Sequence, residues 1–73
     1  MIFLLKKTRE QQGLTQRALS NRSGVLQGFI SAIEAGNKKP SLETAYRLAQ
    51  ALGVKVDELI QPDEQVDTAG QDE

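Results

Sequence analysis

The sequence contains no cysteine and no histidine. Without cysteine there can be neither disulfide bonds nor thiolate ligands for a metal. Without histidine, the commonest general base and the commonest metal ligand are both missing. A glycine-rich loop of the kind that holds a nucleotide phosphate is also absent. We therefore expect a protein that is not an enzyme and that holds neither a metal nor a cofactor.

Long apolar runs are absent as well. The longest, Met1 to Leu5, is far shorter than the roughly 20 residues of a membrane span, and shorter than the apolar part of a signal peptide. We expect no membrane contact and a cytoplasmic, nucleoid-associated location. At 73 residues the chain forms one small domain at most. A domain of this size depends on efficient local packing, because it buries only about 60% of its unfolded surface.

Charge is divided unevenly along the chain. Residues 1–61 hold all nine Lys and Arg against five acids, a charge of +4, whereas residues 62–73 hold five acids and no base. The net charge of −1 therefore describes neither part. The only apolar side chains after Pro62 are Val66 and Ala69, too few to offset the entropy cost of ordering. We predict a folded domain over 1–61 and a disordered acidic tail over 62–73.

Glycine and proline divide the folded part into short segments with helical spacing of apolar residues. The predicted helices are 2–12, 16–22, 27–35, 42–52 and 56–60. Thr15 and Ser41 are the expected N-caps of the second and fourth helices. Strand signals are absent, so the predicted fold class is all-α, a compact five-helix bundle. The residues expected to face the core are Ala18, Leu19, Ile30, Ile33, Leu42, Ala45, Leu48, Ala49, Leu52, Val56, Leu59 and Ile60.

The stretch from 16 to 35 satisfies the requirements of a helix-turn-helix. Ser20 supplies a small residue where the two helices cross, and Gly24 supplies a turn residue that tolerates positive φ. The apolar residues that would hold the two helices at a fixed angle are Leu19, Val25, Ile30 and Ile33.

Together with its flanks, this stretch resembles the phage-repressor and Cro-like helix-turn-helix domain of the XRE family. The strings that carry the resemblance are LKKTREQQGLTQ (5–16), ISAIEAG (30–36) and KPSLET (39–44), followed by LA (48–49), LGV (52–54) and DEL (57–59). The resemblance covers about residues 4–60. It implies a lambda-repressor-like bundle that binds double-stranded DNA as a transcriptional regulator, usually as a homodimer on a two-fold operator.

The resemblance also places the third helix in the major groove. The residues expected to contact bases are Gln27, Gly28, Ser31 and Ala32. A glutamine amide can pair with the N6 and N7 edge of adenine. Gly28 and Ala32 stand where family members often have long polar residues, and no Lys or Arg occurs between Val25 and Ala35. Direct contacts to bases should therefore be few.

Contacts to the DNA backbone are expected on both sides of that helix. The residues concerned are Gln16, Arg17, Phe29, Asn37, Lys38 and Lys39. For Phe29, partial packing in the core is an equal alternative. Leu26 occupies a position where the family often has a Ser or Thr cap, so the third helix should begin without one.

Arg9 and Glu34 match positions where the family often has an ion pair between the first and third helices. The alternative is two independent surface charges. If the pair forms, removing one partner leaves the other buried and uncompensated.

Four consecutive apolar residues, 2–5, span nearly the whole circumference of a helix. Since only one stripe of a first helix faces the core, Ile2 and Leu5 would point inward and Phe3 or Leu4 outward or sideways. Phe3 and Leu4 are therefore a hypothetical surface for self-association or another protein. Otherwise, pairing would involve the fourth and fifth helices.

The leading interpretation is a sequence-specific DNA-binding regulator, most often a repressor. Two alternatives stay open. One is an antitoxin or restriction-controller type of regulator with the same domain. The other is a protein-interaction module that keeps the fold without binding DNA, as the sparsely polar third helix allows.

Overall fold

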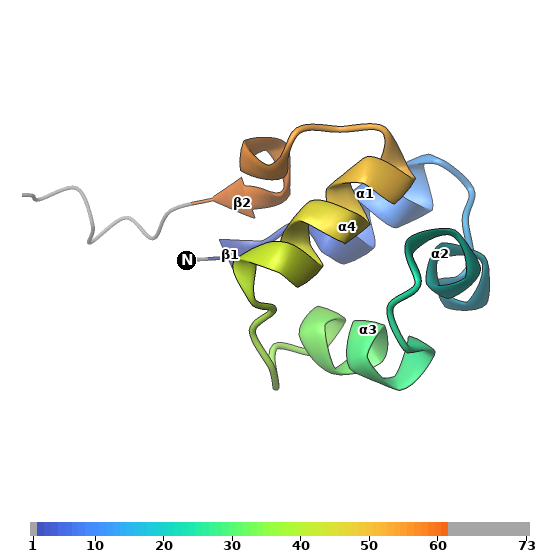
Figure 1. Cartoon of the computed structure of the whole chain (residues 1–73), viewed down its shortest axis with the longest axis horizontal. Helices are drawn as coiled ribbons and strands as arrows, with labels where there is room; N and C mark the ends of the chain where they lie inside the picture. The colour runs from blue at the N-terminus through green and yellow to red at the C-terminus, as the bar shows by residue number, and fades with distance from the viewer. Residues whose placement is uncertain (1, 62–73) are drawn as a thin grey trace, which may run out of the picture.

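The structure, a computed structural model, describes residues 2–61. The predicted acidic tail, 62–73, lies outside the described residues. In chain order the elements are β1 (Ile2–Phe3), α1 (Leu5–Gln11), α2 (Gln16–Ser23), α3 (Gln27–Glu34), α4 (Leu42–Leu52), the 3₁₀ turn η1 (Val56–Leu59) and β2 (Ile60–Gln61). This is an all-α domain with four helices and a 3₁₀ turn, not the five helices expected (Figure 1).

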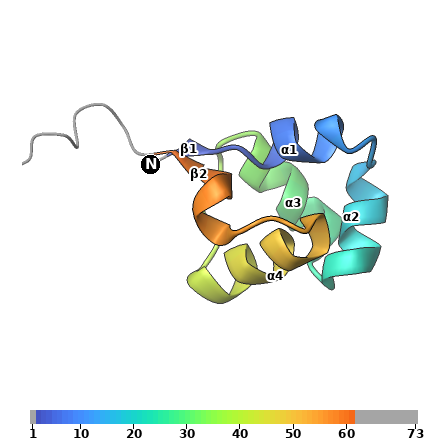
Figure 2. The same cartoon turned by 90° about the horizontal axis from the view of Figure 1, so that it is seen from above.

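The helices surround one apolar core. α2 closes one end of the domain and η1 with β2 closes the other, while α1 and α4 lie on opposite sides when the domain is viewed from above (Figure 2). The largest side chains that are completely buried are Leu5, Leu19, Ile30, Leu48 and Leu59. Each of the four helices and η1 contributes one of them, so each of these five elements is anchored by a buried apolar side chain.

The first predicted helix, 2–12, is wrong at its beginning. Ile2 and Phe3 form an antiparallel strand opposite Gln61 and Ile60, and α1 begins only at Leu5. The amide of Leu4 donates to the carbonyl of Leu59 at 2.7 Å, which extends the backbone pairing to the start of the helix. The prediction that the described chain has no strands is therefore wrong too. Backbone pairing between residues nearly sixty positions apart cannot be inferred from local spacing.

The fifth predicted helix, 56–60, is a single 3₁₀ turn. The side chain of Glu58 accepts a hydrogen bond from the amide of Lys55 at 2.8 Å and fixes the start of the turn. Ile60 then adopts an extended backbone (φ −121°, ψ 134°) and joins β2. The pairing with β1 ends the helical turn, and the side chains of Val56 and Ile60 are only half-buried.

In the other helices, the residues predicted to face the core are buried, with two exceptions. Ala45, Leu48, Ala49 and Leu52 are buried, but Leu42 on the same stripe is 77% exposed. Leu42 is the first residue of α4, and the helix begins outside the core at that point. Ala18 in α2 is only half-buried.

The predicted turn between α2 and α3 is present. Gly24 has φ 76° and its amide donates to the carbonyl of Ser20 at 2.9 Å, ending α2. The hydroxyl of Ser20 donates to the carbonyl of Val25 at 2.6 Å, so the small residue at the crossing also holds the chain after the turn. Val25 and Ile30 are both buried, which fixes α3 against α2.

Replacing Gly24 with alanine should lower the free energy of unfolding by about 1–2 kcal/mol, because a Cβ disfavours left-handed backbone. The matched control is Gly28→Ala. Gly28 lies in the first turn of α3, where an added Cβ has no neighbour within 4 Å, so this change should raise stability by up to about 1 kcal/mol. Urea denaturation measures both. Equal effects would show that the turn does not require glycine.

Candidate nucleic-acid interface

A charged pair lies inside the domain beneath α3. Arg9 Nε donates to Glu34 Oε2 at 2.7 Å and Arg9 Nη2 donates to Glu34 Oε1 at 3.0 Å. Arg9 Nη1 donates to the carbonyl of Leu14 at 2.7 Å. The side chains of Arg9 and Glu34 are only 10% and 4% exposed. The ion pair expected between the first and third helices is therefore present, and its alternative, two independent surface charges, is wrong.

The surroundings of this pair keep it ionised. Burial by itself raises the pKa of Glu34, but the hydrogen bonds from Arg9 and Gln16 and the charges of Arg9 and Lys6 outweigh it, so this pKa lies below its ordinary value. The hydrogen bond to Glu34 raises the pKa of Arg9, although burial opposes it. Each charge is compensated where it is buried, as a stable buried pair requires.

Gln16 is connected to the same carboxylate. Its Nε2 donates to Glu34 Oε1 at 3.0 Å. Gln16 is the first residue of α2, directly after Thr15, whose hydroxyl accepts from the amide of Ala18 at 3.0 Å and confirms the predicted N-cap. The bond between Gln16 and Glu34 could not be inferred from the sequence, because the two residues are 18 positions apart on different helices.

The outer side of α3 carries few polar groups. Gln27, Gly28 and Ser31 are exposed, whereas Ala32 is half-buried rather than fully outward. Leu26 forms no side-chain cap and is 78% exposed. The predicted uncapped start of α3 is confirmed, and its first turn is held by core packing through Ile30.

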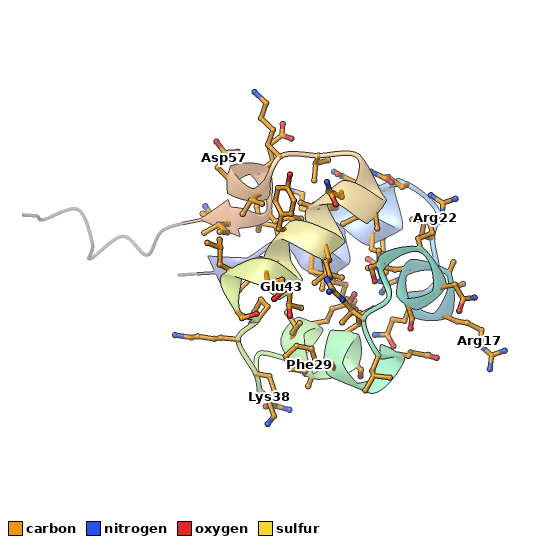
Figure 3. All side chains as sticks on the ribbon, in the orientation of Figure 1. Arg17, Arg22, Phe29, Lys38, Glu43 and Asp57 are labelled. Atoms are coloured by element: carbon orange, nitrogen blue, oxygen red, sulfur yellow. The ribbon has the colours of Figure 1, made fainter. Side chains whose placement is uncertain are left out.

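Phe29 is half-buried and packs against the apolar core. This matches the alternative of partial core packing, and its predicted contact with the DNA backbone stays a prediction. Arg17 and Lys38 project beyond the two ends of α3 on its side of the molecule (Figure 3).

The loop after α3 is held close to the helix. The amides of Asn37 and Lys38 both donate to the carbonyl of Ala32, at 2.9 and 3.3 Å. Lys39 follows, and all three side chains are exposed. The structure thus combines a bare helix surface with basic groups at its borders.

A second feature, which the sequence analysis did not identify, is an apolar cleft of about 630 Å³ between α4 and η1. Tyr46, Val54, Val56 and Ile60 are among its lining residues, and Tyr46 is 55% exposed. Tyr46 does not lie on the core-facing side of α4. That position was the one signal in the sequence that could have indicated this cleft. In Figure 1, η1 and β2 lie across the core from α3.

Comparisons with known proteins identify this arrangement. Residues 5–59 match the family HTH_3, helix-turn-helix. The chain is 45% identical over 56 residues to the uncharacterized HTH-type transcriptional regulator y4dJ of Sinorhizobium fredii, covering 77% of this chain and 73% of that protein.

Two solved structures are also similar. The restriction-modification controller protein C.AhdI from Aeromonas hydrophila shares 32% identity at a TM-score of 0.74, covering 77% of this chain and 85% of that one. A chain of the SinR–SinI protein complex shares 27% identity at a TM-score of 0.76, covering 97% of this chain and 69% of that one.

The chain belongs to the helix-turn-helix family, XRE/Cro type, whose domains bind DNA in transcriptional regulators and are not enzymes. Within residues 2–61, none of the helices has the length and apolar character needed to span a membrane.

Changing Glu34 to glutamine should lower the free energy of unfolding by about 3 kcal/mol or more, because Arg9 then stays buried with only the exposed carboxylate of Glu10, 3.8 Å away, as a counter-charge. The control is Glu43→Gln, which removes the exposed pair with Arg47 and should cost far less. Urea denaturation measures both. The double change Arg9→Met with Glu34→Leu should recover most of the loss.

The ion pair of Arg9 and Glu34 also predicts how the stability of the protein changes at low pH. Because the pKa of Glu34 is lowered on folding, its stabilising contribution is complete above the ordinary value of 4.5 and is lost as pH falls through the folded pKa. The Glu34→Gln variant should therefore lose less stability than the wild type below about pH 4.5. If the free energy of unfolding falls equally with pH in both proteins, other carboxylates determine the loss of stability in acid.

Proposed function

We propose that this domain binds double-stranded DNA sequence-specifically, as a repressor-type transcriptional regulator, with α3 in the major groove. The observation that carries the proposal is the exposed surface of α3 with basic groups beyond both of its ends (Figure 3). An α-helix fits the major groove of B-form DNA, and flanking Lys and Arg contact the phosphates on either side. Such a protein, of bacterial or phage type, would act in the cytoplasm, on the nucleoid.

In this proposal the bases are contacted mainly by Gln27. It is exposed in the first turn of α3, where an amide reaches the groove floor and can pair with adenine. Gly28 has no side chain, and the half-buried Ala32 offers at most a methyl contact. Since no basic side chain extends from α3, much of the affinity would come from Arg17, Asn37, Lys38 and Lys39 at the phosphates.

A restriction-controller role is the second candidate, favoured by the similarity to C.AhdI across 85% of that chain. It uses the same DNA surface and differs in the genes controlled. A protein-interaction module is the third, and the SinR–SinI complex shows that a relative of this fold binds another protein. A salt titration of binding to a generic duplex separates the third candidate from the other two. For a DNA-binding protein, the logarithm of the affinity falls linearly with the logarithm of the salt concentration, whereas a protein-interaction module has little affinity for DNA to lose.

Two variants should weaken DNA binding in different ways. One is the single variant Gln27→Ala, and the other is the double variant Lys38→Ala, Lys39→Ala. Losing Gln27 should cost about 1–3 kcal/mol on the preferred sequence only. Losing the two lysines should weaken binding equally on all sequences and flatten the log-affinity against log-salt slope by about one unit per contact. Fluorescence anisotropy on specific and generic duplexes measures this. A uniform loss for Gln27→Ala would exclude it from base contact, and an unchanged slope would place the loop away from DNA.

We further propose that the domain forms a homodimer through the cleft between α4 and η1. Apolar surface around an exposed aromatic residue is typical of a protein interface. Phe3, the alternative, packs partly against the core and is engaged in β1, which leaves less of it for a partner. Because η1 lies across the core from α3, such pairing would leave α3 open to DNA (Figure 1).

Tyr46→Ser should therefore raise the dimer dissociation constant by about tenfold or more in sedimentation experiments. Leu26→Ser, at an even more exposed apolar residue beside α3, should have no effect. If the double variant Phe3→Ser, Leu4→Ser dissociates the protein and Tyr46→Ser does not, the interface lies at the N-terminus instead.

A further inference from the structure

A recess of about 320 Å³ lies where α1, α2 and α3 meet. Its lining residues are Lys6, Arg9, Gln16, Ser31, Glu34 and Ala35. From the sequence, Gln16 is expected at a phosphate and Ser31 at a base, and Lys6 has no expected role. The recess brings these three side chains together from three different helices.

The charge of the recess comes from Lys6. Both oxygens of Glu34 already accept hydrogen bonds from Arg9, so the acid and the base at the bottom of the recess neutralise each other. Lys6 is exposed, and the ion pairs found among residues 2–61 do not include it. Lys6 lines the recess together with Glu34, and its charge helps to lower the pKa of that carboxyl.

The uncommitted groups around the recess are donors. Gln16 uses one amide hydrogen on Glu34 and keeps the second. Ser31 is exposed and carries a hydroxyl. The first amides of α2 have no partner within the helix, and Thr15 takes only the amide of Ala18. A cation with several donors at the start of a helix is a suitable environment for a tetrahedral oxyanion.

We propose that Lys6 binds a backbone phosphate of DNA in this recess, together with Gln16 and Ser31. This rests on the proposed DNA binding and deepens it. Glu34 acts as a positioning residue: as an acceptor, it fixes the amide nitrogen of Gln16 toward the recess. Ser31 then contacts the DNA backbone rather than a base. A phosphodiester is preferred over free phosphate because the recess borders α3, the helix proposed to enter the groove.

Lys7 provides a matched control on the same helix. It has the same charge and is also exposed, but the next residue of a helix points about 100° away. Lys7 lines a neighbouring hollow, which Lys6 and Glu10 also line, but of the two lysines only Lys6 lines the recess of Gln16 and Ser31. A general effect of positive charge would appear at both lysines, whereas a built phosphate site would appear only at Lys6.

The test measures binding of the full chain to a generic duplex of about 20 base pairs between about 50 and 200 mM KCl. Lys6→Ala should flatten the log–log salt slope by about one unit and weaken binding roughly five- to tenfold at 0.1 M salt. Lys7→Ala should weaken it less than about twofold, and Lys6→Arg should retain most of the affinity. Thermal midpoints within a few degrees of the wild type, about the shift of 1 kcal/mol in a domain this small, would show that each variant is folded.

Three results would overturn this inference. Equal effects at Lys6 and Lys7 would show that only overall charge matters. A loss for Ser31→Ala that depends on the base sequence would return Ser31 to base contact. If inorganic phosphate at matched ionic strength raises the thermal midpoint of the wild type but not of Lys6→Ala, the recess is a site for free anions. If the wild type shows no salt-dependent binding to any duplex, the proposed function itself fails, which is a separate outcome.

Discussion

The buried pair of Arg9 and Glu34 connects the elements on which the DNA surface depends. Arg9 belongs to α1 and Glu34 ends α3, and the pair also reaches the carbonyl of Leu14 and the amide of Gln16 at the start of α2. A pair of this kind contributes little net stability compared with apolar packing, but it is intolerant of a wrong arrangement because each charge requires its partner. Its effect is therefore to fix how α3 and the start of α2 sit relative to each other, and these two elements carry the proposed contacts with DNA.

Local signals explain what could be predicted from the sequence. The caps at Thr15 and Ser41 and the turn at Gly24 depend on chemistry within a few residues, and all three occur as expected. The Arg9–Glu34 pair came from family resemblance, since nothing local links residues 25 positions apart. The pairing of β1 with β2 was missed because it joins the two ends of the domain, and a run of four apolar residues carries no information about such a distant partner. The bond of Gln16 to Glu34 and the recess beside Lys6 depend on how three helices meet, which spacing within one helix does not give.

The strand pair also changes the meaning of the N-terminal apolar run. In a helix, four apolar residues in sequence would expose at least one of them, and that reasoning led to a partner surface at Phe3 and Leu4. In the structure, Leu4 donates its amide to Leu59 and Phe3 packs on the core, so the run joins the start of the domain to its end. An apolar cleft is found instead beside Tyr46, where the spacing of α4 turns a large aromatic ring away from its own core.

The bare surface of α3 has a consequence for how such a domain could be selective. With one amide side chain in its first turn and no basic residue along it, α3 offers few direct contacts with bases. A monomer would then gain affinity largely from phosphate contacts, which depend on salt and not on sequence. Discrimination between DNA sequences must then come from the number of base contacts made at once, from the spacing of the half-sites and from the shape of the duplex. Pairing two copies through a surface away from α3 would double the specific contacts and fix the separation of the two half-sites. The proposed base contacts of α3 and the proposed pairing through the apolar cleft are therefore connected: a helix with so few base contacts would gain specificity mainly when a second copy holds it in register.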